Sequence, residues 1–247
     1  MNTLCWNCRG LGDPATVHEL RDIARECAPT VLCVVETQIA KYRVEGLAST
    51  LGFDNAFGVG SSGRSGGICI FWKNSLDVSI KNFSRYHVDA WGKEPLKEQW
   101  RLSCFYGEAN RSLRYKTWDM MTRLRGESTL PWLCIGDFNE ILRKEEQMGV
   151  HERDSAQMEA FREATDLCAL ADLGYKGLDW TWEKKVSGGH YCRVRLDRAL
   201  ASASWSTLFP LASVEHLTAA KSDHSPILLA TDLVSESVRA AQRPFRY

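Results

Sequence analysis

The sequence predicts an α/β protein in which two mainly antiparallel β-sheets pack face to face and are flanked by helices. Three observations support this fold class. Apolar and polar residues alternate with a period of two through much of the chain, several uniformly apolar runs have the length of a strand, and only about three segments show a helical period. A doubly wound parallel sheet is disfavoured because it would need more helices.

The chain opens with a strand, a helix and a second strand. Residues 3–7 form an apolar run, after which Asp13 and Pro14 suit the N-cap and the first position of a helix. Apolar residues then recur at the helical period as far as Cys27. The next run, residues 31–35, is uniformly apolar and rich in β-branched side chains, which predicts a buried strand.

The middle of the chain predicts sheet strands followed by a helix and one more strand. Residues 67–72, 78–83 and 100–106 have strand patterns, and we expect them to be antiparallel neighbours. Residues 112–125 have a helical pattern. Residues 132–135 are a short apolar run, which predicts a buried strand.

The last third of the chain predicts a helix, a hairpin and a final strand. Residues 155–168 place apolar side chains on one helical face. Residues 180–182 and 193–200 flank a Ser-Gly-Gly turn at 187–189, which indicates a hairpin with a loop longer than two residues. Residues 226–231 form the last apolar run.

Length, composition and charge predict one globular domain. The chain has 247 residues, of which 44% are hydrophobic, and this is enough for one domain with a sizeable core. We assign residues 1–232 to this domain and the polar, basic residues 233–247 to a linker. The 31 basic residues balance the 31 acidic ones, so any contact with a polyanion must come from local patches.

Cysteine usage and hydropathy predict the compartment. The nine cysteines lack paired spacing and lie mostly in apolar runs, as expected of reduced thiols that pack as small hydrophobes. This predicts a cytosolic or nuclear protein. The first residues lack a signal-peptide pattern, and no apolar stretch is long enough to span a bilayer, so we expect neither secretion nor membrane insertion.

Polar side chains lie at the ends of four predicted strands. Asn7 and Glu36 end two of them, Asp137 and Asn139 follow a third, and His224 lies just before the last. Loops at strand ends build active sites, so we expect these side chains to converge. The set suits metal-assisted cleavage of a phosphate ester, with a carboxylate for Mg²⁺, an aspartate for water and a histidine for the phosphate charge.

Each of these residues also has a purely structural explanation. Asp137 with Asn139 is typical of an Asx turn. His224 is typical of a satisfied loop histidine, although Asp197 offers a carboxylate that would orient the imidazole and keep it protonated. Asp197 also suits an exposed charge paired with an arginine. Glu36 closes an apolar strand, where a carboxylate needs a cation, and this cation is either Mg²⁺ or a nearby basic side chain.

Further candidates lie around this set. Asn7 either supports the metal or a phosphate oxygen, or caps the turn that follows it. Tyr106 either donates to a phosphate or is an ordinary tyrosine at a strand end. Basic residues in predicted loops either grip phosphates on both sides of a cleft or are ordinary solvated charges. These basic residues are Arg64, Arg111, Arg114, Lys184, Lys185 and Arg193.

Seven motifs carry a family resemblance. They are Trp6-Asn7-Cys8-Arg9-Gly10, Glu36-Thr37-Gln38, Tyr106-Gly107, Gly136-Asp137-Phe138-Asn139, Thr181-Trp182, Arg195-Leu196-Asp197-Arg198 and Ser222-Asp223-His224-Ser225-Pro226. In this order they resemble the endonuclease/exonuclease/phosphatase superfamily, which includes DNase I and the apurinic/apyrimidinic endonucleases. The resemblance covers about Asn2 to Thr231. Four further segments are Gly63-Arg64-Ser65-Gly66-Gly67, Met158-Glu159-Ala160-Phe161-Arg162, the run from Leu196 to Ser202, and Pro244-Phe245-Arg246-Tyr247. Through these segments the chain most resembles the N-terminal endonuclease domain of plant LINE-type (non-LTR) retrotransposon polyproteins.

The resemblance implies a four-layer α/β sandwich of the DNase I type and a Mg²⁺-dependent endonuclease, in which Mn²⁺ can substitute. Such an enzyme nicks duplex DNA and leaves a 3′-hydroxyl. In a retroelement this hydroxyl primes reverse transcription by a polymerase domain, which the linker would join covalently to this chain in the parent polyprotein. We expect the isolated domain to be a monomer that acts in the nucleus, after synthesis in the cytoplasm.

The resemblance also implies roles for the motif residues. Glu36 would hold the divalent ion with help from Asn7, and Asp223 would be a further metal or orienting ligand. Asp137 would activate or orient the attacking water, and Asn139 would position Asp137.

The remaining motif residues would act on the phosphate. His224, paired with Asp197, would stabilise the developing charge, and Tyr106 would donate a hydrogen bond. Thr181 and Ser222 would contact the phosphate or support the residues that do.

One position departs from the family pattern, and two other functions remain open. Many abasic-site endonucleases have an acidic residue two positions after the first Asn, where this chain has Arg9, and this favours target nicking over abasic-site repair. The alternatives are a phosphatase that acts on a small phosphoester and a catalytically decayed module that binds DNA.

Overall fold

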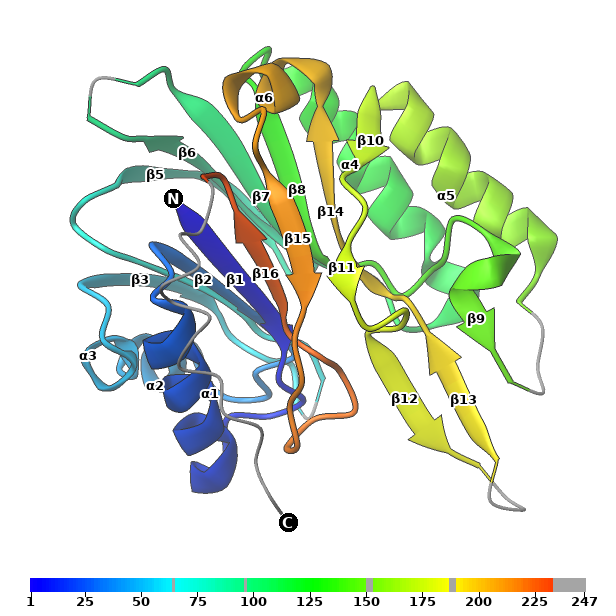
Figure 1. Ribbon diagram of the computed structural model, residues 1–247, viewed down its shortest axis with the longest axis horizontal. Coiled ribbons are helices and arrows are strands. Elements are labelled where there is room, and N and C mark those ends of the chain that lie inside the picture. The colour runs from blue at the N-terminus through cyan, green and yellow to red at the C-terminus, as the bar shows by residue number, and fades with distance from the viewer. Residues whose placement is uncertain (64, 96, 150–152, 187–189, 233–247) are drawn as a thin grey trace.

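Two large β-sheets pack face to face, and helices cover their outer faces, as Figure 1 shows. This α/β sandwich confirms the fold class predicted from the sequence. The predicted linker at 233–247 and the predicted turn at 187–189 lie outside the described residues. The computed structural model describes residues 1–63, 65–95, 97–149, 153–186 and 190–232.

Within the described residues, the first sheet has seven strands. Its central strands β1 and β2 are parallel and match the first two strands predicted from the sequence. The strand order is β11 (Lys176–Gly177), β15 (Ser213–His216), β16 (Ile227–Ala230), β1 (Asn2–Asn7), β2 (Val31–Val35), β4 (Ile68–Trp72) and β3 (Asn55–Val59).

The second sheet has six strands in the described part of the chain, and a small third sheet of three strands lies beside one end of the sandwich. The order in the second sheet is β10 (Leu170–Asp172), β14 (Asp197–Ser202), β8 (Trp132–Asp137), β7 (Trp100–Tyr106), β6 (His87–Lys93) and β5 (Asp77–Ser84). The order in the third is β12 (Trp182–Lys185), β13 (Tyr191–Val194) and β9 (Gln147–Met148).

The helices begin where local capping dictates. Asp13 caps the first helix by accepting a hydrogen bond from Ala15 N at 2.9 Å, as predicted. The helix expected from residue 112 begins later, because a 3₁₀ turn at Arg111–Leu113 precedes it. The α-helices are α1 (Pro14–Cys27), α2 (Lys41–Glu45), α3 (Ala48–Leu51), α4 (Tyr115–Glu127), α5 (Ser155–Leu167) and α6 (Ala203–Leu208).

Buried apolar side chains form three layers, which explain why the central strands are uniformly apolar. Successive residues of a strand face opposite sides of the sheet. Cys5 and Cys33 therefore lie between the two sheets, whereas Leu4 and Leu32 pack under α1. A third layer lies between the six-stranded sheet and the pair α4 and α5, and it includes Phe161. Both faces of each sheet are thus covered, as a four-layer sandwich requires.

Two details of the predicted sheets are wrong. The strands expected at 67–72, 78–83 and 100–106 are not neighbours, because β4 belongs to the seven-stranded sheet and β6 lies between β5 and β7. The strand expected at 193–200 is two strands, β13 and β14, in different sheets. The chain leaves one sheet for the other at Arg195, whose side chain pairs with Asp172.

The described residues contain free cysteines and no membrane-spanning helix. All nine cysteines lie within the described residues and are free. Among the helices of this described part, none is both long and apolar enough to cross a membrane.

A buried polar cluster lies on the neighbouring strands β6 and β7. Arg101 and Asp89 are both 1% exposed, and Arg101 Nε donates to Asp89 Oδ1 at 2.8 Å. His87 is fully buried beside them, and its Nδ1 lies 2.8 Å from Ser84 Oγ. Burial, together with the charge of Arg101, lowers the pKa of His87 to about 4.

We predict that His87 makes the folded state lose stability as the pH falls from 6.5 towards 4. In this window the unfolded chain binds a proton at His87 and the folded chain does not, so the free energy of unfolding decreases as the pH decreases. The expected loss is about 1–3 kcal/mol. Urea unfolding at several pH values measures the free energy of unfolding. Between pH 6.5 and 4 this free energy should change less with pH in His87→Phe than in the wild-type chain, and an equal change in both would contradict the prediction.

Candidate active site

The polar residues that end β1, β2 and β8 lie at one end of the sandwich. β1 and β2 are parallel and in register, with Asn7 opposite Val35, so Asn7 and Glu36 lie at the same end of the two strands. In the other sheet, Asp137 at the end of β8 is the register partner of Asp197 at the start of β14. Face-to-face packing of the sheets then brings these side chains together.

Asn7 connects the two sheets through its side-chain amide. Asn7 Nδ2 donates to Glu36 Oε2 at 3.1 Å and to Asp137 Oδ2 at 2.9 Å. The same nitrogen lies 3.4 Å from His224 Nε2, and Asn7 is fully buried. The amide therefore holds carboxylates from different sheets at one point.

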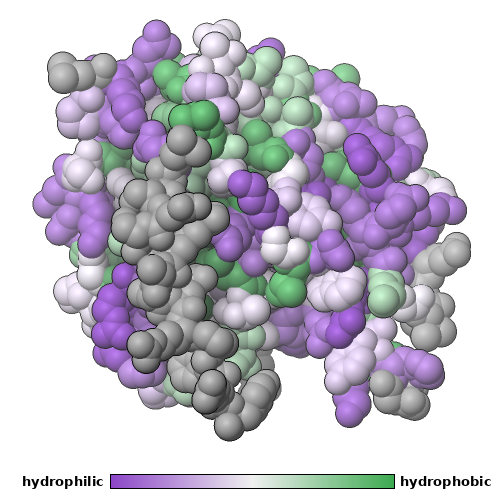
Figure 2. Space-filling model, viewed as in Figure 1, coloured by the Kyte–Doolittle hydropathy of each residue, from purple (hydrophilic) through white to green (hydrophobic). Residues whose placement is uncertain are grey.

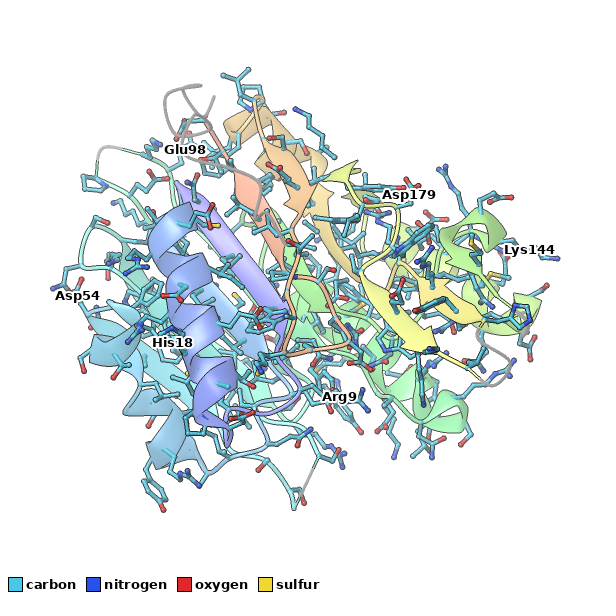
Figure 3. The ribbon with its side chains drawn as sticks, turned by 60° about the horizontal axis from the view of Figure 1, so that its bottom comes forward. Arg9, His18, Asp54, Glu98, Lys144 and Asp179 are labelled. Atoms are coloured by element: carbon cyan, nitrogen blue, oxygen red, sulfur yellow. The ribbon has the colours of Figure 1, made fainter. Side chains whose placement is uncertain are left out.

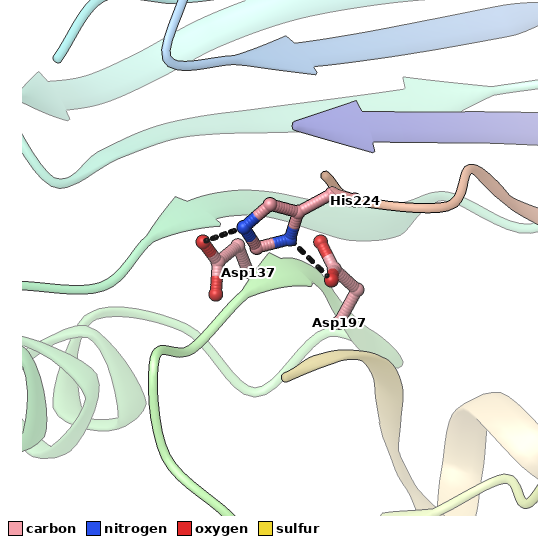
Figure 4. Close-up of side chains that lie close together, drawn as sticks. All are labelled: Asp137, Asp197 and His224. Atoms are coloured by element: carbon pink, nitrogen blue, oxygen red, sulfur yellow. Dashed lines mark hydrogen bonds and ion pairs between the residues drawn. The ribbon is translucent and has the colours of Figure 1, made fainter. Parts of the chain in front are cut away.

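His224 lies between two aspartates, as Figure 4 shows. Its Nδ1 donates to Asp197 Oδ2 at 2.9 Å, and its Nε2 is 3.9 Å from Asp137 Oδ2. Trp6 Nε1 donates to the His224 carbonyl at 2.9 Å, and the His224 N–H donates to Ser222 Oγ at 3.1 Å. Side-chain and backbone contacts together fix the imidazole.

The pKa values of Asp137 and His224 both rise. Burial raises the pKa of Asp137 to about 7, and the charge of Asp197 adds to the rise while His224 opposes it. Burial alone would lower the pKa of His224, but the charges of Asp197 and Asp137 outweigh it and raise the pKa to about 9. Near neutral pH the imidazole is therefore protonated, and Asp137 is able to accept a proton.

A tight turn aims the Asp137 carboxylate. Asp137 Oδ1 accepts from the Asn139 N–H at 2.8 Å, and Asn139 Nδ2 donates to the Gly107 carbonyl at 2.9 Å. Gly136, just before Asp137, has a φ of 151°, and a Cβ there would lie 2.0 Å from the Phe105 carbonyl oxygen. Only glycine permits this close approach of β7 and β8.

Glu36 and Asp223 line one open hollow at the mouth of the site. Glu36 is half-buried, and its Oε1 accepts from Gln38 Nε2 at 2.9 Å. Asp223 Oδ2 pairs with Arg9, which Figure 3 labels, and accepts from Trp182 Nε1 at 3.0 Å. Asp223 Oδ1 is buried without a hydrogen-bond partner in the described residues. These oxygen donors fit a hard divalent cation.

A second group of potential ligand atoms is better suited to proton sharing. Atoms of Asp137, Asp197 and His224 lie within 4.8 Å of one another. His224 Nδ1 already contacts Asp197 Oδ2 at 2.9 Å, and Asp137 Oδ2 already accepts from Asn7 Nδ2 at 2.9 Å, so these atoms are engaged with one another. Asn7 Oδ1 accepts from the Arg9 N–H at 3.2 Å, and Asn7 Nδ2 donates to the Glu36 carboxylate at 3.1 Å.

Three further predicted site residues lie close to this centre. Tyr106 is buried, and burial with the nearby charges of Glu36 and Asp137 raises the pKa of its phenol, which stays a neutral donor. Thr181 Oγ1 accepts from the Asp197 N–H at 2.9 Å. Ser222 Oγ donates to the Asn7 carbonyl at 2.8 Å. Thr181 and Ser222 therefore brace residues of the site.

The predicted basic residues do not form one patch. Arg111 pairs with Asp154 at 3.2 Å, and Arg114 is buried against Glu140 at 2.5 Å, so Arg114 is not presented to a substrate. Lys184 and Lys185 are exposed on β12.

Of the last two predicted basic residues, Arg193 and Arg64, the structure describes only Arg193. Arg193, on β13, pairs with Glu183 and lies 4.6 Å above the ring of Trp180. Arg64 lies outside the described residues.

Sequence reasoning missed several residues that hold the site in place. Gln38 and Trp182 donate to the two carboxylates of the hollow, and Trp6 fixes the backbone of His224. All three lie within the motifs that carry the family resemblance, and this was the available signal. Glu140 is fully buried next to Asn139, and a charged residue directly after Asp-Phe-Asn was the signal there.

A family model settles the family. The model for the Endonuclease/Exonuclease/phosphatase family matches residues 4–224. The chain belongs to this family. Its members are hydrolytic nucleases and phosphatases that depend on divalent metals, and the carboxylates Glu36 and Asp223 suit such a metal. No curated protein sequence matches the chain.

Solved structures support the same fold. The endonuclease domain of TRAS1, a telomere-specific non-LTR retrotransposon, is 15% identical with a TM-score of 0.71, over 92% of this chain and 96% of that one. An AP endonuclease from Archaeoglobus fulgidus is 16% identical with a TM-score of 0.72, over 94% and 100%. A 3′ phosphatase from Neisseria, bound to product DNA hairpin, is 16% identical with a TM-score of 0.70, over 94% and 99%. At these identities the likeness shows the fold.

We predict that Mg²⁺ raises the melting temperature of the wild-type chain and that Glu36→Gln removes most of this rise. A ligand that binds only the folded state stabilises it, and the substitution removes a charged oxygen donor from the hollow. Thermal unfolding with and without Mg²⁺ measures the effect. Glu215→Gln, a half-buried glutamate on β15, is the matched control and should respond like the wild-type chain. An unchanged response of Glu36→Gln would place the ion elsewhere.

Proposed function

We propose that the chain is a Mg²⁺-dependent DNA endonuclease that hydrolyses one phosphodiester of duplex DNA and leaves a 3′-hydroxyl. One observation carries this proposal. The Asn7 amide holds Glu36 and Asp137 together beside a histidine that is itself paired with Asp197. A metal-facing carboxylate, a basic carboxylate and a protonated imidazole then lie around one point, as hydrolysis of a phosphate ester requires.

Asp137, His224 and Tyr106 have different roles in the proposed hydrolysis. Asp137, with a pKa of about 7, accepts a proton from the attacking water. His224, kept protonated by Asp197, donates a hydrogen bond from Nε2 to a phosphate oxygen. Tyr106, as a neutral phenol, donates another. These donors are fixed before the substrate arrives, so little reorganisation is needed in the transition state.

Glu36 and Asp223 would hold the divalent ion, with Mn²⁺ able to replace Mg²⁺. When bound, such an ion offsets negative charge on the phosphate and on the leaving oxygen. Gln38 and Asn7 keep the Glu36 carboxylate turned towards the hollow.

Duplex DNA is the substrate that the surroundings favour. The hairpin of β12 and β13 stands beside the site and exposes Lys184 and Lys185. On the face that Figure 2 shows, hydrophilic residues lie mainly along the left and right sides, and hydrophobic residues lie mainly towards the top and the middle. We propose a monomeric domain, residues 1–232, that acts on DNA in the nucleus. In a retroelement, residues 233–247 would link it to a reverse transcriptase.

We predict that the purified chain nicks supercoiled plasmid in Mg²⁺ and that Asp137→Ala abolishes nicking. The substitution removes the proton acceptor and the partner of the Asn7 amide. Gel electrophoresis of the relaxed form measures the reaction, with a chelator as the metal control. Nicking that survives Asp137→Ala would place the chemistry at another site, and DNA binding without nicking would favour a decayed module.

We predict that His224→Ala lowers turnover by about 100-fold or more while DNA affinity changes by less than about threefold. The imidazole is fixed inside the site and acts on charge that develops in the transition state, so it adds little to binding of the duplex. Single-turnover nicking and a gel-shift titration measure the two quantities. Equal losses in both would contradict this role.

A phosphatase acting on a small phosphoester is the second candidate. The family includes phosphatases, and the Neisseria 3′ phosphatase, which was solved with product DNA, has the same fold. An inositol phosphate assayed beside the plasmid distinguishes the two, because the endonuclease proposal expects phosphate release from neither substrate.

A further inference from the structure

A buried ion cluster lies directly behind the turn formed by residues 137–139. Glu140 is fully buried, and its Oε2 accepts from Arg114 Nη1 at 2.5 Å. Its Oε1 accepts from Arg153 Nη1 at 3.0 Å. The three side chains come from the loop after β8, the residue before α4 and the loop before α5. We call Glu140, Arg114 and Arg153 the Glu140 cluster.

Arg153 connects this cluster to the turn. The Nη1 atom that binds Glu140 also donates to the Asn139 carbonyl at 2.7 Å. Asn139 has a φ of 57°, a left-handed conformation that is uncommon for residues other than glycine. In this conformation its N–H points at Asp137 Oδ1. Arg153 therefore holds the carbonyl of Asn139, and the N–H of the same residue aims the Asp137 carboxylate.

The members of the cluster differ in burial and in what they contact. Glu140 and Arg114 are buried, whereas the Arg153 side chain is 19% exposed. Removing Glu140 would leave Arg114 buried without its ion-pair partner, and Arg153 is the member that reaches the turn. The glutamate is therefore the centre of the cluster, and Arg153 is its contact with the active site.

We propose that Glu140 and Arg153 are positioning residues, which fix the 137–139 turn so that Asp137 is aimed at the attacking water. This inference rests on the proposed endonuclease function. Glu140 acts through Arg153, Arg153 acts through the Asn139 backbone, and neither touches the substrate.

Two substitutions test the cluster, with nicking of duplex DNA as the assay. Glu140→Gln removes the central charge, and Arg153→Met removes both hydrogen bonds of Nη1. Each should lower kcat by about 10- to 100-fold, because small displacements of a reacting group cost this much, with KM within about twofold of the wild-type value. Arg153→Lys should recover most of the lost kcat, because an ammonium group is able to donate to both oxygen atoms.

Asp89→Asn is the matched control. Like Glu140→Gln, it converts a buried carboxylate that is paired with an arginine into an amide of the same shape, but in the cluster of His87 and Arg101. It should lower the melting temperature and leave kcat per folded molecule unchanged. An equal fall in kcat for Asp89→Asn, or an unchanged kcat for Glu140→Gln and Arg153→Met, would overturn the proposal.

Hydrogen exchange separates this inference from the proposed function. The Asn139 N–H should exchange faster in Arg153→Met than in the wild-type chain and in Asp89→Asn, because the substitution frees the Asn139 carbonyl. If the wild-type chain nicks no DNA, the proposed function fails while this exchange still decides whether the cluster holds the turn. Equal protection of the Asn139 N–H in all three proteins would overturn the proposal.

Discussion

The site depends on one buried amide that joins carboxylates from two sheets. Asn7 Nδ2 donates to both Glu36 and Asp137, and this shared donor offsets the repulsion between the two carboxylates. The position of this amide follows from the backbone, because β1 and β2 are parallel and their C-terminal ends lie side by side. The packing of the sheets, through core residues such as Cys5 and Cys33, therefore sets the geometry of the chemistry.

The same arrangement raises the pKa values of both Asp137 and His224. Burial keeps Asp137 in a form that readily takes up a proton, while Asp197 keeps His224 charged. Glu36 and Asn139 both have left-handed backbone conformations, at φ values of 55° and 57°. Such conformations cost about 1–3 kcal/mol each and persist where the surroundings fix them. The supports of the site, rather than the catalytic groups alone, must therefore be rigid.

The sequence predicted most of the fold where burial on both faces of a sheet leaves a strong signal. β2 and α1 were predicted at their observed bounds, because a uniformly apolar strand and a capped amphipathic helix are encoded locally. β6 was missed, because its buried polar residue Asp89 breaks the apolar pattern and is satisfied by Arg101 on the next strand. In the site, strand-end residues were found, whereas the burial of Arg114 depends on Glu140, a partner 26 residues away that local spacing does not reveal.

The charge distribution at the candidate site agrees with the dependence of the family on a divalent metal. The chain is neutral overall, yet Glu36, Asp137, Asp197 and Asp223 gather at one end of the sandwich. A phosphate that approached these carboxylates alone would be repelled. The protonated His224 and the Arg9 guanidinium offset part of this charge, but each is already paired with an aspartate. In the function proposed above, a divalent cation held by Glu36 and Asp223 would supply the missing positive charge and would let a phosphate approach these carboxylates.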